Sequence, residues 1–410
     1  MNKELTAVNA FIFAGSFSIG VMKAGFNLKK VLEIADNQPE TNAFYFIKNY
    51  PNIPVILPSE WENDKYLNKL KNENIDLMCC NCPCSSLSTI NRNASVEGKN
   101  NVHFYRLFNV FEKMQPKVFV IENAPTLIKL GFPILKDMIN KLNHLYNFTI
   151  IHDKAGNHNV AMQRMRTMVV GWRKDVFEKH PLINPNKQEQ LTCKKLLEDI
   201  YNDTTNDHKS DYDKISELYY LGIPGKPIMT SICRHYLKME DDDSDELSNK
   251  IFTVINNNKE FLHEFNTINE KLKAGKNLWD KSPFKPYENG IFPSFSSVQE
   301  YLHPIQNRTL NIKELQRLMN YPDSYDFSDP ENKCKIPVCQ AMAQGVPANF
   351  GKWIAEQVKL ALDKKLLLDD TNADVIFQHH IKHQYSTFSY DEFLKLNEVD
   401  IQKEHKKLNE

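Results

Sequence analysis

The chain has 410 residues, 41% of them apolar and without an internal repeat, so it can bury a large core shared by two lobes and an extension. Its 51 Lys and Arg residues balance 52 Asp and Glu residues, which excludes a uniformly basic surface for nucleic acid and leaves only a local one. Eight cysteines without regular spacing, no apolar run of membrane-spanning length and no targeting segment at Met1–Leu5 predict a cytoplasmic protein with free thiols and no membrane partner.

The first 175 residues alternate short apolar runs with amphipathic helices, the pattern of an α/β fold with a parallel sheet covered on both faces. Strands are predicted at residues 9–13, 75–78, 118–121 and 167–170. Helices are predicted at residues 19–24, 104–111 and 134–142, the last two from apolar side chains at helical spacing. In such a sheet, ligands bind at the carboxyl ends of the strands.

Chemically reactive side chains gather where three of these strands begin or end. Pro83 and Cys84 lie in the Ser-rich loop after one strand, and Glu122 ends the next. Arg164 and Arg166 lead into a third strand, and residues two apart on an extended chain point the same way. The sequence therefore predicts a nucleophile, an acid and two fixed cations at strand edges.

This set of side chains suits chemistry on carbon 5 of a cytosine, whose ring is a weak nucleophile. A thiolate that adds to carbon 6 makes carbon 5 enamine-like, which divides one difficult step into two easier ones. A carboxyl group can hydrogen-bond the ring nitrogen, and a guanidinium can hold the carbonyl oxygen as charge builds up there. Cys84, Glu122 and Arg166, with Arg164 beside it, match these roles. Taken singly, such a cysteine is more typical of a buried structural thiol, and paired arginines also occur in surface ion-pair rows.

With these residues, the chain resembles the DNA (cytosine-5) methyltransferase family in the family's motif order, from about residue 11 to about residue 362. The matching segments are the cofactor loop and helix at 13–26, the catalytic loop at 83–88, Glu122-Asn123-Ala124, Arg164-Met165-Arg166, residues 308–323 and residues 344–349. Motifs that recur in order are far more specific than any one of them. The resemblance implies a Rossmann-like S-adenosylmethionine-dependent methyltransferase sheet with a smaller target recognition domain.

The resemblance divides the chain into four segments. They are a catalytic and cofactor-binding domain at 1–175, a target recognition domain at 176–325, a C-terminal motif returning to the catalytic domain at 326–362 and a C-terminal extension at 363–410. Within the recognition domain, Arg234 and Lys238 are among the candidate phosphate contacts, whereas phosphate repulsion would hold the acidic run at 240–246 away from DNA. The extension carries too many aromatic residues for a disordered tail, so we expect it to pack on the catalytic lobe or on a partner.

The resemblance also implies an S-adenosylmethionine site. Its residues are Phe13, Ala14, Gly15, Ser16 and Phe17 of the loop, with Pro83 and Asn349. The loop is shorter than the family pattern and has fewer glycines, but Gly15 still allows a tight turn and a close approach of the backbone to the ligand. An acidic residue should end the next strand and bind the ribose hydroxyls, and Glu33 is favoured slightly over Asp36.

The substrate implied by the resemblance is a cytosine flipped out of duplex DNA, because carbon 6 cannot be reached inside the base stack. Ser85, Ser88 and Asn123 are expected on the substrate side of the catalytic loop. Double-stranded DNA is the expected partner, and a restriction endonuclease of the same system is a further candidate. Two alternatives stay open, namely a cytosine-5 methyltransferase of the same fold that acts on RNA and a DNA-binding homologue that has lost methyl transfer.

Two clusters of potential metal ligands are interpreted as ordinary residues. The four cysteines between residues 79 and 84 are densely spaced, but adjacent strand cysteines point to opposite faces, and zinc sites usually take a second ligand pair from elsewhere. The three histidines between residues 379 and 383 have no carboxylate or cysteine partner in the pattern. No metal site is therefore predicted.

Overall fold

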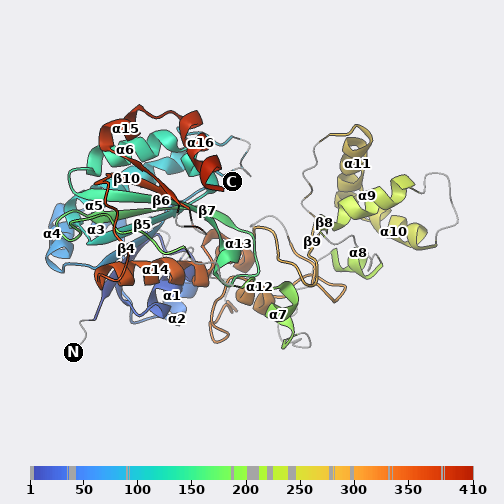
Figure 1. Cartoon of the computed structure of the whole chain (residues 1–410). Helices are drawn as coiled ribbons and strands as arrows, with labels where there is room; N and C mark the ends of the chain where they lie inside the picture. Colours follow the sequence, from blue (N-terminus) through green and yellow to red (C-terminus); the bar gives the residue numbers. More distant parts are fainter. Residues whose placement is uncertain are drawn as a thin grey trace.

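The computed structural model shows a large α/β lobe beside a smaller, mostly helical lobe (Figure 1). It describes residues 4–34, 36, 43–88, 91, 93–185, 189–200, 212–218, 225–238, 246–276, 280, 282–295, 300–330, 333–334, 336–379, 382 and 384–409. Residues 240–245 of the acidic run, and two of the clustered histidines, His380 and His383, lie outside the described residues.

In the described part of the chain, nine strands form one sheet in the order β11-β10-β6-β7-β5-β4-β1-β2-β3. Their bounds are β1 Thr6–Ala10, β2 Asn27–Leu32, β3 Val55–Ile56, β4 Leu77–Asn81, β5 Val118–Asn123, β6 Tyr146–Lys154, β7 Met165–Arg173, β10 Val375–Gln378 and β11 Tyr385–Phe388. Five neighbouring strands, β3, β2, β1, β4 and β5, run parallel, so their carboxyl ends meet at one edge. The prediction of a parallel sheet is wrong for β7, which runs antiparallel between β5 and β6 because no α-helical crossover joins β6 to β7.

Helices cover both faces of the sheet (Figure 1). One face carries α1 Ser16–Lys23, α2 Phe44–Asn49 and α14 Ala348–Leu362, and the other carries α3 Pro58–Trp61, α4 Asp64–Asn72, α5 Val102–Met114 and α6 Phe132–Leu142. Alternation along the strands divides the core, since Cys79 and Val120 belong to the first face and Cys80 and Ile121 to the second. The neighbouring cysteines thus face opposite sides as predicted, and α5 and α6 confirm two of the predicted helices.

The first strand and the turn after it differ from the prediction. β1 ends at Ala10, and Phe11 and Phe13 have left-handed backbone, with φ values of 63° and 49°. The predicted strand at 9–13 is therefore wrong beyond Ala10, because a residue in this conformation cannot continue a strand. The chain turns directly into α1, whose N-cap residue Gly15 is also left-handed, with φ at 85°.

The C-terminal extension widens the sheet. β10 pairs parallel with β6, and β11 pairs antiparallel with β10 at the new edge. Val375, Phe377 and Phe393 lie in the same core as α5 and α6. Two helices, α15 Tyr390–Lys395 and α16 Glu398–Asn409, cover this end of the lobe (Figure 1). Of the two expected outcomes for the extension, packing on residues 1–175 or on a partner, the structure shows the first.

The smaller lobe has a hydrophobic core of its own. Its elements are α8 Tyr212–Leu218, β8 Lys226–Pro227, α9 Ile228–Lys238, α10 Glu246–Asn256, α11 Lys259–Lys273 and β9 Phe284–Lys285. Ile232, Ile255 and Phe265 are among the side chains buried in this core. β8 pairs with β9, which joins the start of α9 to the chain that leaves α11. A short helix, α7 Cys193–Leu197, precedes the lobe.

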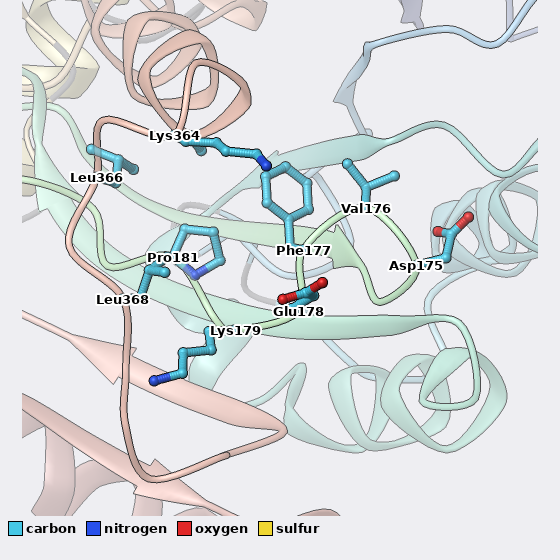
Figure 2. Close-up of a pocket in the computed structure, with 10 residues that line it drawn as sticks. Asp175, Val176, Phe177, Glu178, Lys179, Pro181, Lys364, Leu366 and Leu368 are labelled. Carbon is cyan, nitrogen blue, oxygen red and sulfur yellow. The ribbon is translucent and has the colours of Figure 1, made fainter.

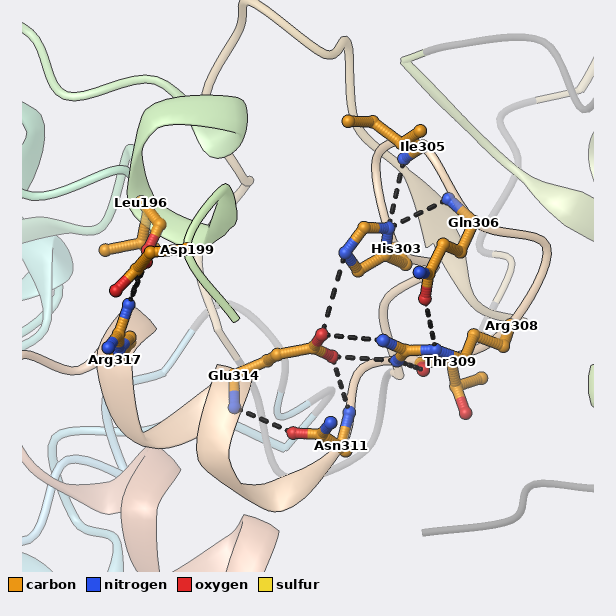
Figure 3. A network of polar contacts seen from close by, with 10 residues as sticks. All are labelled: Leu196, Asp199, His303, Ile305, Gln306, Arg308, Thr309, Asn311, Glu314 and Arg317. Carbon is orange, nitrogen blue, oxygen red and sulfur yellow. Dashed lines mark hydrogen bonds and ion pairs between the residues drawn. The ribbon is translucent and has the colours of Figure 1, made fainter. Parts of the chain in front are cut away.

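The chain returns from the smaller lobe through a buried polar network (Figure 3). Glu314 lies in α12 Ile312–Leu318 and is fully buried, and its carboxylate accepts two hydrogen bonds from the Arg308 guanidinium, at 2.9 and 2.7 Å. Asn311 and Glu314 form a capping box, in which each side chain accepts from the backbone amide of the other. The ion pair therefore fixes the start of α12, and α13 Val338–Gln344 and α14 follow it.

All eight cysteines are free thiols. Five of them are buried, and Cys84, Cys334 and Cys339 are partly exposed. Among the residues that the structure describes, no helix combines the length and the apolar character needed to cross a membrane.

Candidate active site

The predicted catalytic loop follows β4 at the carboxyl edge of the sheet. The Cys84 carbonyl accepts the Leu87 amide at 3.0 Å, which closes a turn that leaves Cys84 partly exposed. Asn123 at the end of β5 is buried and donates to the Cys82 carbonyl at 2.9 Å. Thr126 donates to the Leu87 carbonyl. The end of β5 and the segment after it thus hold both sides of the turn.

Cys84 is the accessible member of the cysteine cluster. Burial raises the pKa of the Cys79, Cys80 and Cys82 thiols, so these groups stay protonated at neutral pH. For Cys82, the nearby Cys84 and Glu122 raise the pKa further. Because a nucleophilic thiol must be reached by its substrate, Cys84 is the cysteine of this cluster that suits the role.

Polar side chains of the segment before α5 hold the outer side of the loop. Asn91 donates to the Ser85 carbonyl at 2.8 Å, and Asn100 donates to the Ser85 hydroxyl. Ser85 is exposed, whereas Pro83 and Ser88 are half-buried. The two serines predicted on the substrate side therefore lie on the same loop as the accessible thiol.

The predicted acid and one cation form an ion pair beside this loop. Arg166 Nε lies 2.5 Å from Glu122 Oε1, and both side chains are nearly buried. β5 and β7 are antiparallel neighbours with Glu122 opposite Met168, so the strand pairing brings the two charged groups together. Asn81 at the end of β4 donates to the other Glu122 oxygen at 3.3 Å. The attraction between these two charges is stronger than in an exposed ion pair, because water screens the charges of an exposed pair.

Arg164 has different partners from Arg166. Its buried guanidinium donates to the carbonyls of Phe295, Ala343 and Gly345, at 2.5, 2.5 and 2.8 Å. Burial, and then the Arg166 charge, lower the pKa of Arg164, while the charges of Glu122 and Cys84 oppose this shift. The pKa of Arg164 thus responds to the charges of the other three predicted catalytic residues. The Arg164 guanidinium is nevertheless bonded to the chain that returns from the smaller lobe.

The predicted cofactor loop runs from β1 into α1. Gly15 makes its left-handed turn against the Phe46 ring, where a β-carbon would lie 2.3 Å from the nearest ring atom. The Tyr325 hydroxyl donates to the Ala14 carbonyl at 2.8 Å. Phe13 is half-buried, and Ser16 and Phe17 are buried. The conformation of the loop thus depends on α2 and on the chain that follows α12.

Glu33, directly after β2, is the carboxylate that contacts this loop. It is fully buried and accepts the backbone amides of Ile12 and Ile34, at 3.1 and 3.2 Å. Burial raises the pKa of Glu33 to about 7, although both amides favour the charged form. Asp36 is exposed and instead accepts the Ser59 amide at 2.9 Å. Of the two predicted acids, the structure brings Glu33 to the cofactor loop and places Asp36 near α3.

The C-terminal motif reaches the cofactor loop through two closely packed helices. A β-carbon on Gly20 of α1 would lie 2.3 Å from a backbone oxygen of α14, and one on Gly351 of α14 would lie 2.6 Å from the Phe17 ring. Glycine at both positions therefore permits the close contact between α1 and α14. Asn349 lies in the first turn of α14 and donates to the Asn159 carbonyl at 3.1 Å, which ties this helix to the turn after β6.

Sequence reasoning does not find three side chains that shape the site, namely Asn81, Trp61 and Tyr325. The Trp61 indole donates to the Glu33 carbonyl at 2.8 Å, and Tyr325 holds the cofactor loop from a position 311 residues away. Such distant partners leave no local signal in the sequence. Asn81 does leave one, because a polar residue ends an otherwise apolar strand directly before the catalytic loop.

A pocket of about 420 Å³ lies at the opposite edge of the sheet (Figure 2). It is formed by the loop after β7 and by the segment after α14, and Phe177, Pro181, Lys364 and Leu366 are among its lining residues. The end of β7 pairs with the start of β5, whereas Glu122 lies toward the other end of β5. The length of these strands therefore separates the pocket from the reactive residues.

The chain is similar to known proteins along most of its length. Residues 6–360 match the model of the family described as C-5 cytosine-specific DNA methylase. The chain is 24% identical over 371 residues to the type II methyltransferase M.Sau96I of Staphylococcus aureus, a match that covers 87% of this chain and 76% of the relative. It is 23% identical over 381 residues to the type II methyltransferase M.XorII of Xanthomonas oryzae pv. oryzae, with 87% and 85% covered. A solved DNA modification methyltransferase encoded within an E. coli prophage has the same fold, with a TM-score of 0.57, 17% identity and coverage of 88% of this chain and 100% of that one.

Proposed function

Because this chain belongs to the C-5 cytosine-specific DNA methylase family, we propose that it methylates carbon 5 of a cytosine flipped out of duplex DNA, with S-adenosylmethionine as the methyl donor. The observation that carries the proposal is the partly exposed Cys84 thiol in the loop after β4, together with the Glu122–Arg166 ion pair on the neighbouring strands β5 and β7. A stacked base cannot bring carbon 6 to this thiol, so the reaction requires base flipping.

Cys84 is the nucleophile of the proposed reaction. Its thiolate forms a bond to carbon 6, and the electrons of the C5–C6 double bond make carbon 5 nucleophilic. Carbon 5 then bonds the methyl group while the bond from that methyl group to the donor sulfur breaks, and S-adenosylhomocysteine leaves. After methylation, the proton on carbon 5 leaves to solvent, the C5–C6 double bond re-forms and the C6–S bond breaks. Cys84 is thereby released as the thiolate, so the enzyme ends the cycle unchanged.

Glu122 and Arg166 stabilise the base while it carries the adduct. Glu122 hydrogen-bonds ring nitrogen N3, and Arg166 binds the base oxygen as negative charge builds up there. Arg166 Nε is engaged with Glu122, and Nη1 donates to the Met165 carbonyl at 2.8 Å. Among the contacts that the structure describes, Nη2 is therefore the part of the guanidinium available to the base.

The residues around the cofactor loop suit S-adenosylmethionine, which supplies an electrophilic methyl group. Among the contacts that the structure describes, the Glu33 carboxylate after β2 accepts only the backbone amides of Ile12 and Ile34, one on each oxygen, so each oxygen can also accept a ribose hydroxyl. The donor carries no phosphate, so one left-handed glycine at Gly15 suffices for a close approach of the backbone. We assign the ribose to Glu33 rather than Asp36, and the rest of the site to Phe13, Ala14, Ser16, Phe17 and Pro83, with Asn349 supporting it through α14.

The supporting residues act through the chain segments that they join. Arg164 is a positioning residue, because it ties the returning chain to the strand that carries Arg166. Asn123 holds the loop beneath the thiol, and Ser85 and Ser88 lie where the loop meets the substrate. We assign catalysis to residues 1–175 with the returning motif at 326–362, and recognition of the target to residues 176–325.

The biological setting is part of the same proposal. Both relatives are named type II methyltransferases, which supports a restriction-modification system whose endonuclease would cut unmethylated copies of the same site. The eight free thiols suit a reducing compartment, so we place the protein in the cytoplasm. DNA methylated by this protein would then resist that endonuclease.

The decisive experiment compares the wild type with Cys84→Ala. Each purified protein is incubated with mixed-sequence duplex DNA and radiolabelled S-adenosylmethionine, and the DNA is digested to nucleosides. We expect label in 5-methylcytosine with the wild type and none with the variant. The melting temperature should be nearly unchanged, because the substituted side chain is partly exposed.

A parallel incubation with RNA separates the alternatives. Label in RNA alone would favour a methyltransferase of the same fold that acts on RNA. A protein that binds duplex DNA but transfers no label to DNA or RNA would be a silent homologue, and the proposed function would be wrong.

A further inference from the structure

The carboxyl edge of the sheet, which carries the predicted catalytic residues, is the reactive edge. Asn81 is a buried amide at this edge, and the proposed reaction gives it no role. It ends β4 and pairs directly with Glu122 across β4 and β5. The residue is 1% exposed. Its Nδ2 donates to Glu122, while its Oδ1 is buried and, within the described structure, has no hydrogen-bond partner. An unpaired buried carbonyl oxygen is unfavourable, so this oxygen calls for a partner in the working complex.

The orientation of the amide follows from its neighbour. Glu122 Oε2 is an acceptor, so Asn81 must present its nitrogen to it and its oxygen away from it. A flipped amide would set two acceptor oxygens against each other. Because Arg166 already bonds the other Glu122 oxygen, the acceptor left at the end of this row is Asn81 Oδ1.

Arg166, Glu122 and Asn81 form a row of three polar side chains whose order matches that of the hydrogen-bonding groups of cytosine. Arg166, Glu122 and Asn81 stand on β7, β5 and β4, which are consecutive strands of the sheet. The base presents its oxygen, ring nitrogen N3 and 4-amino group in the same order along one edge. If Arg166 holds the oxygen and Glu122 holds N3, the 4-amino group lies on the side of Asn81. A donor then meets the one acceptor of the row that, within the described structure, lacks a partner.

We propose that Asn81 Oδ1 accepts a hydrogen bond from the 4-amino group of the flipped base and that Asn81 thereby selects cytosine. This inference rests on the proposed function. Uracil and thymine carry an oxygen where cytosine carries the amino group, so they would set an acceptor against Asn81 Oδ1. A site whose buried polar group is left unpaired discriminates strongly against the wrong substrate.

The test compares two bases that differ only at this group. Sequencing the 5-methylcytosine made by the wild type on plasmid DNA first identifies the target site. Synthetic duplexes then carry either cytosine or pyrimidin-2-one, which has hydrogen in place of the 4-amino group, at the target position. We expect Asn81→Ala to lower kcat/KM on cytosine by roughly ten- to a hundredfold, as the loss of one buried hydrogen bond does. Its kcat/KM on pyrimidin-2-one should fall by a clearly smaller factor, because on that base the variant loses the hydrogen bond to Glu122 but none to the base.

A matched control distinguishes selection of the base by Asn81 from mere structural support of the site. Asn101 is another buried asparagine, which donates to the Ser95 and Val96 carbonyls near the catalytic loop, so Asn101→Ala should lower both activities by the same factor. If Asn81→Ala also lowers both equally, Asn81 only positions Glu122 and the inference is overturned. Asn81→Ser provides the same comparison if the alanine variant does not fold. A wild type that makes no 5-methylcytosine would overturn the proposed function together with this inference.

Discussion

The reactive edge of the sheet and the smaller lobe are built in opposite ways. At the edge, Asn81, Glu122 and Arg166 are buried polar groups bonded to one another. The smaller lobe instead buries isoleucine and phenylalanine side chains and leaves Arg234 and Lys238 of α9 exposed. A buried polar network depends on each of its members, whereas a hydrophobic core tolerates exchanges of similar volume.

With target recognition assigned to the smaller lobe as proposed, this difference predicts that the chemistry and the reading of DNA can be altered separately. Changes at the reactive edge should alter the rate of methyl transfer on every DNA sequence to the same degree. Changes on the surface of the smaller lobe should alter binding and leave the chemical step intact. The chain that returns from the smaller lobe is held by Arg164, which bonds the Phe295 and Ala343 carbonyls, and by the Arg308–Glu314 ion pair at the start of α12.

The largest effect is expected for Glu122→Gln at the reactive edge. Glutamine keeps an oxygen for Arg166 but cannot act as an acid toward the ring nitrogen, so the single-turnover rate of methyl transfer should fall roughly 10²- to 10⁴-fold. Affinity for duplex DNA, measured by fluorescence anisotropy, should change little. A rate within a few-fold of the wild type would show that Glu122 has no part in the chemistry.

A smaller effect is expected from the titration of Glu33. Its pKa of about 7 in the folded protein lies above its ordinary value of 4.5, so the folded state binds the proton more tightly. The resulting stabilisation is complete below about pH 4.5 and is lost as the pH rises toward 7, by roughly 3 kcal/mol in total.

The comparison of wild type with Glu33→Gln isolates this group. Urea denaturation at several pH values should show a decline in wild-type stability between about pH 5 and pH 7 that exceeds the decline in Glu33→Gln, whose side chain does not titrate. Hydrogen exchange should show that the pH-dependent difference in stability between the two proteins lies in β1 and β2 and not in α9 to α11. Equal slopes for the two proteins would contradict the raised pKa.

The smallest effect is expected for the double variant Arg234→Ala/Lys238→Ala on α9. If these exposed cations bind phosphates, the slope of log affinity for duplex DNA against log salt should decrease by about 0.9 for each phosphate that the variant no longer neutralises. The single-turnover rate at saturating DNA should be unchanged, and the free energy of unfolding should stay within about 0.5 kcal/mol of the wild-type value. Lys403→Ala on α16, an exposed cation at the far end of the chain, is the matched control and should leave the slope unchanged. An unchanged slope in the double variant would remove α9 from the DNA-binding surface.

Much of the catalytic lobe could be predicted because its signals are local. The helices α5 and α6 follow from apolar spacing, and the opposite orientation of Cys79 and Cys80 follows from strand alternation. The predicted first strand extends too far along the chain, because its apolar residues continue to Phe13 while the backbone becomes left-handed at Phe11. The direction of β7 could not be predicted, since an apolar run has the same pattern in parallel and antiparallel strands.

In the candidate site, too, residues with a local signal could be predicted, whereas their distant partners could not. Cys84, Glu122 and Arg166 can be proposed from the sequence as catalytic residues, because the chemistry admits few residue types and each stands next to a strand end. The structure adds that Arg164 bonds three distant carbonyls, that Glu33 rather than Asp36 contacts the cofactor loop, and that Asn81 joins the reactive row.

The sequence by itself determined which side chains are candidates for the reaction and at which strand ends they stand, because strand ends and alternation depend only on neighbouring residues. The tertiary structure alone decided their partners, such as Arg166 for Glu122 and Tyr325 for the cofactor loop. These partners come from segments far away in the chain, and their contacts depend on strand order and on the close packing of α1 with α14. Neither property leaves a periodic signal in the residues that take part.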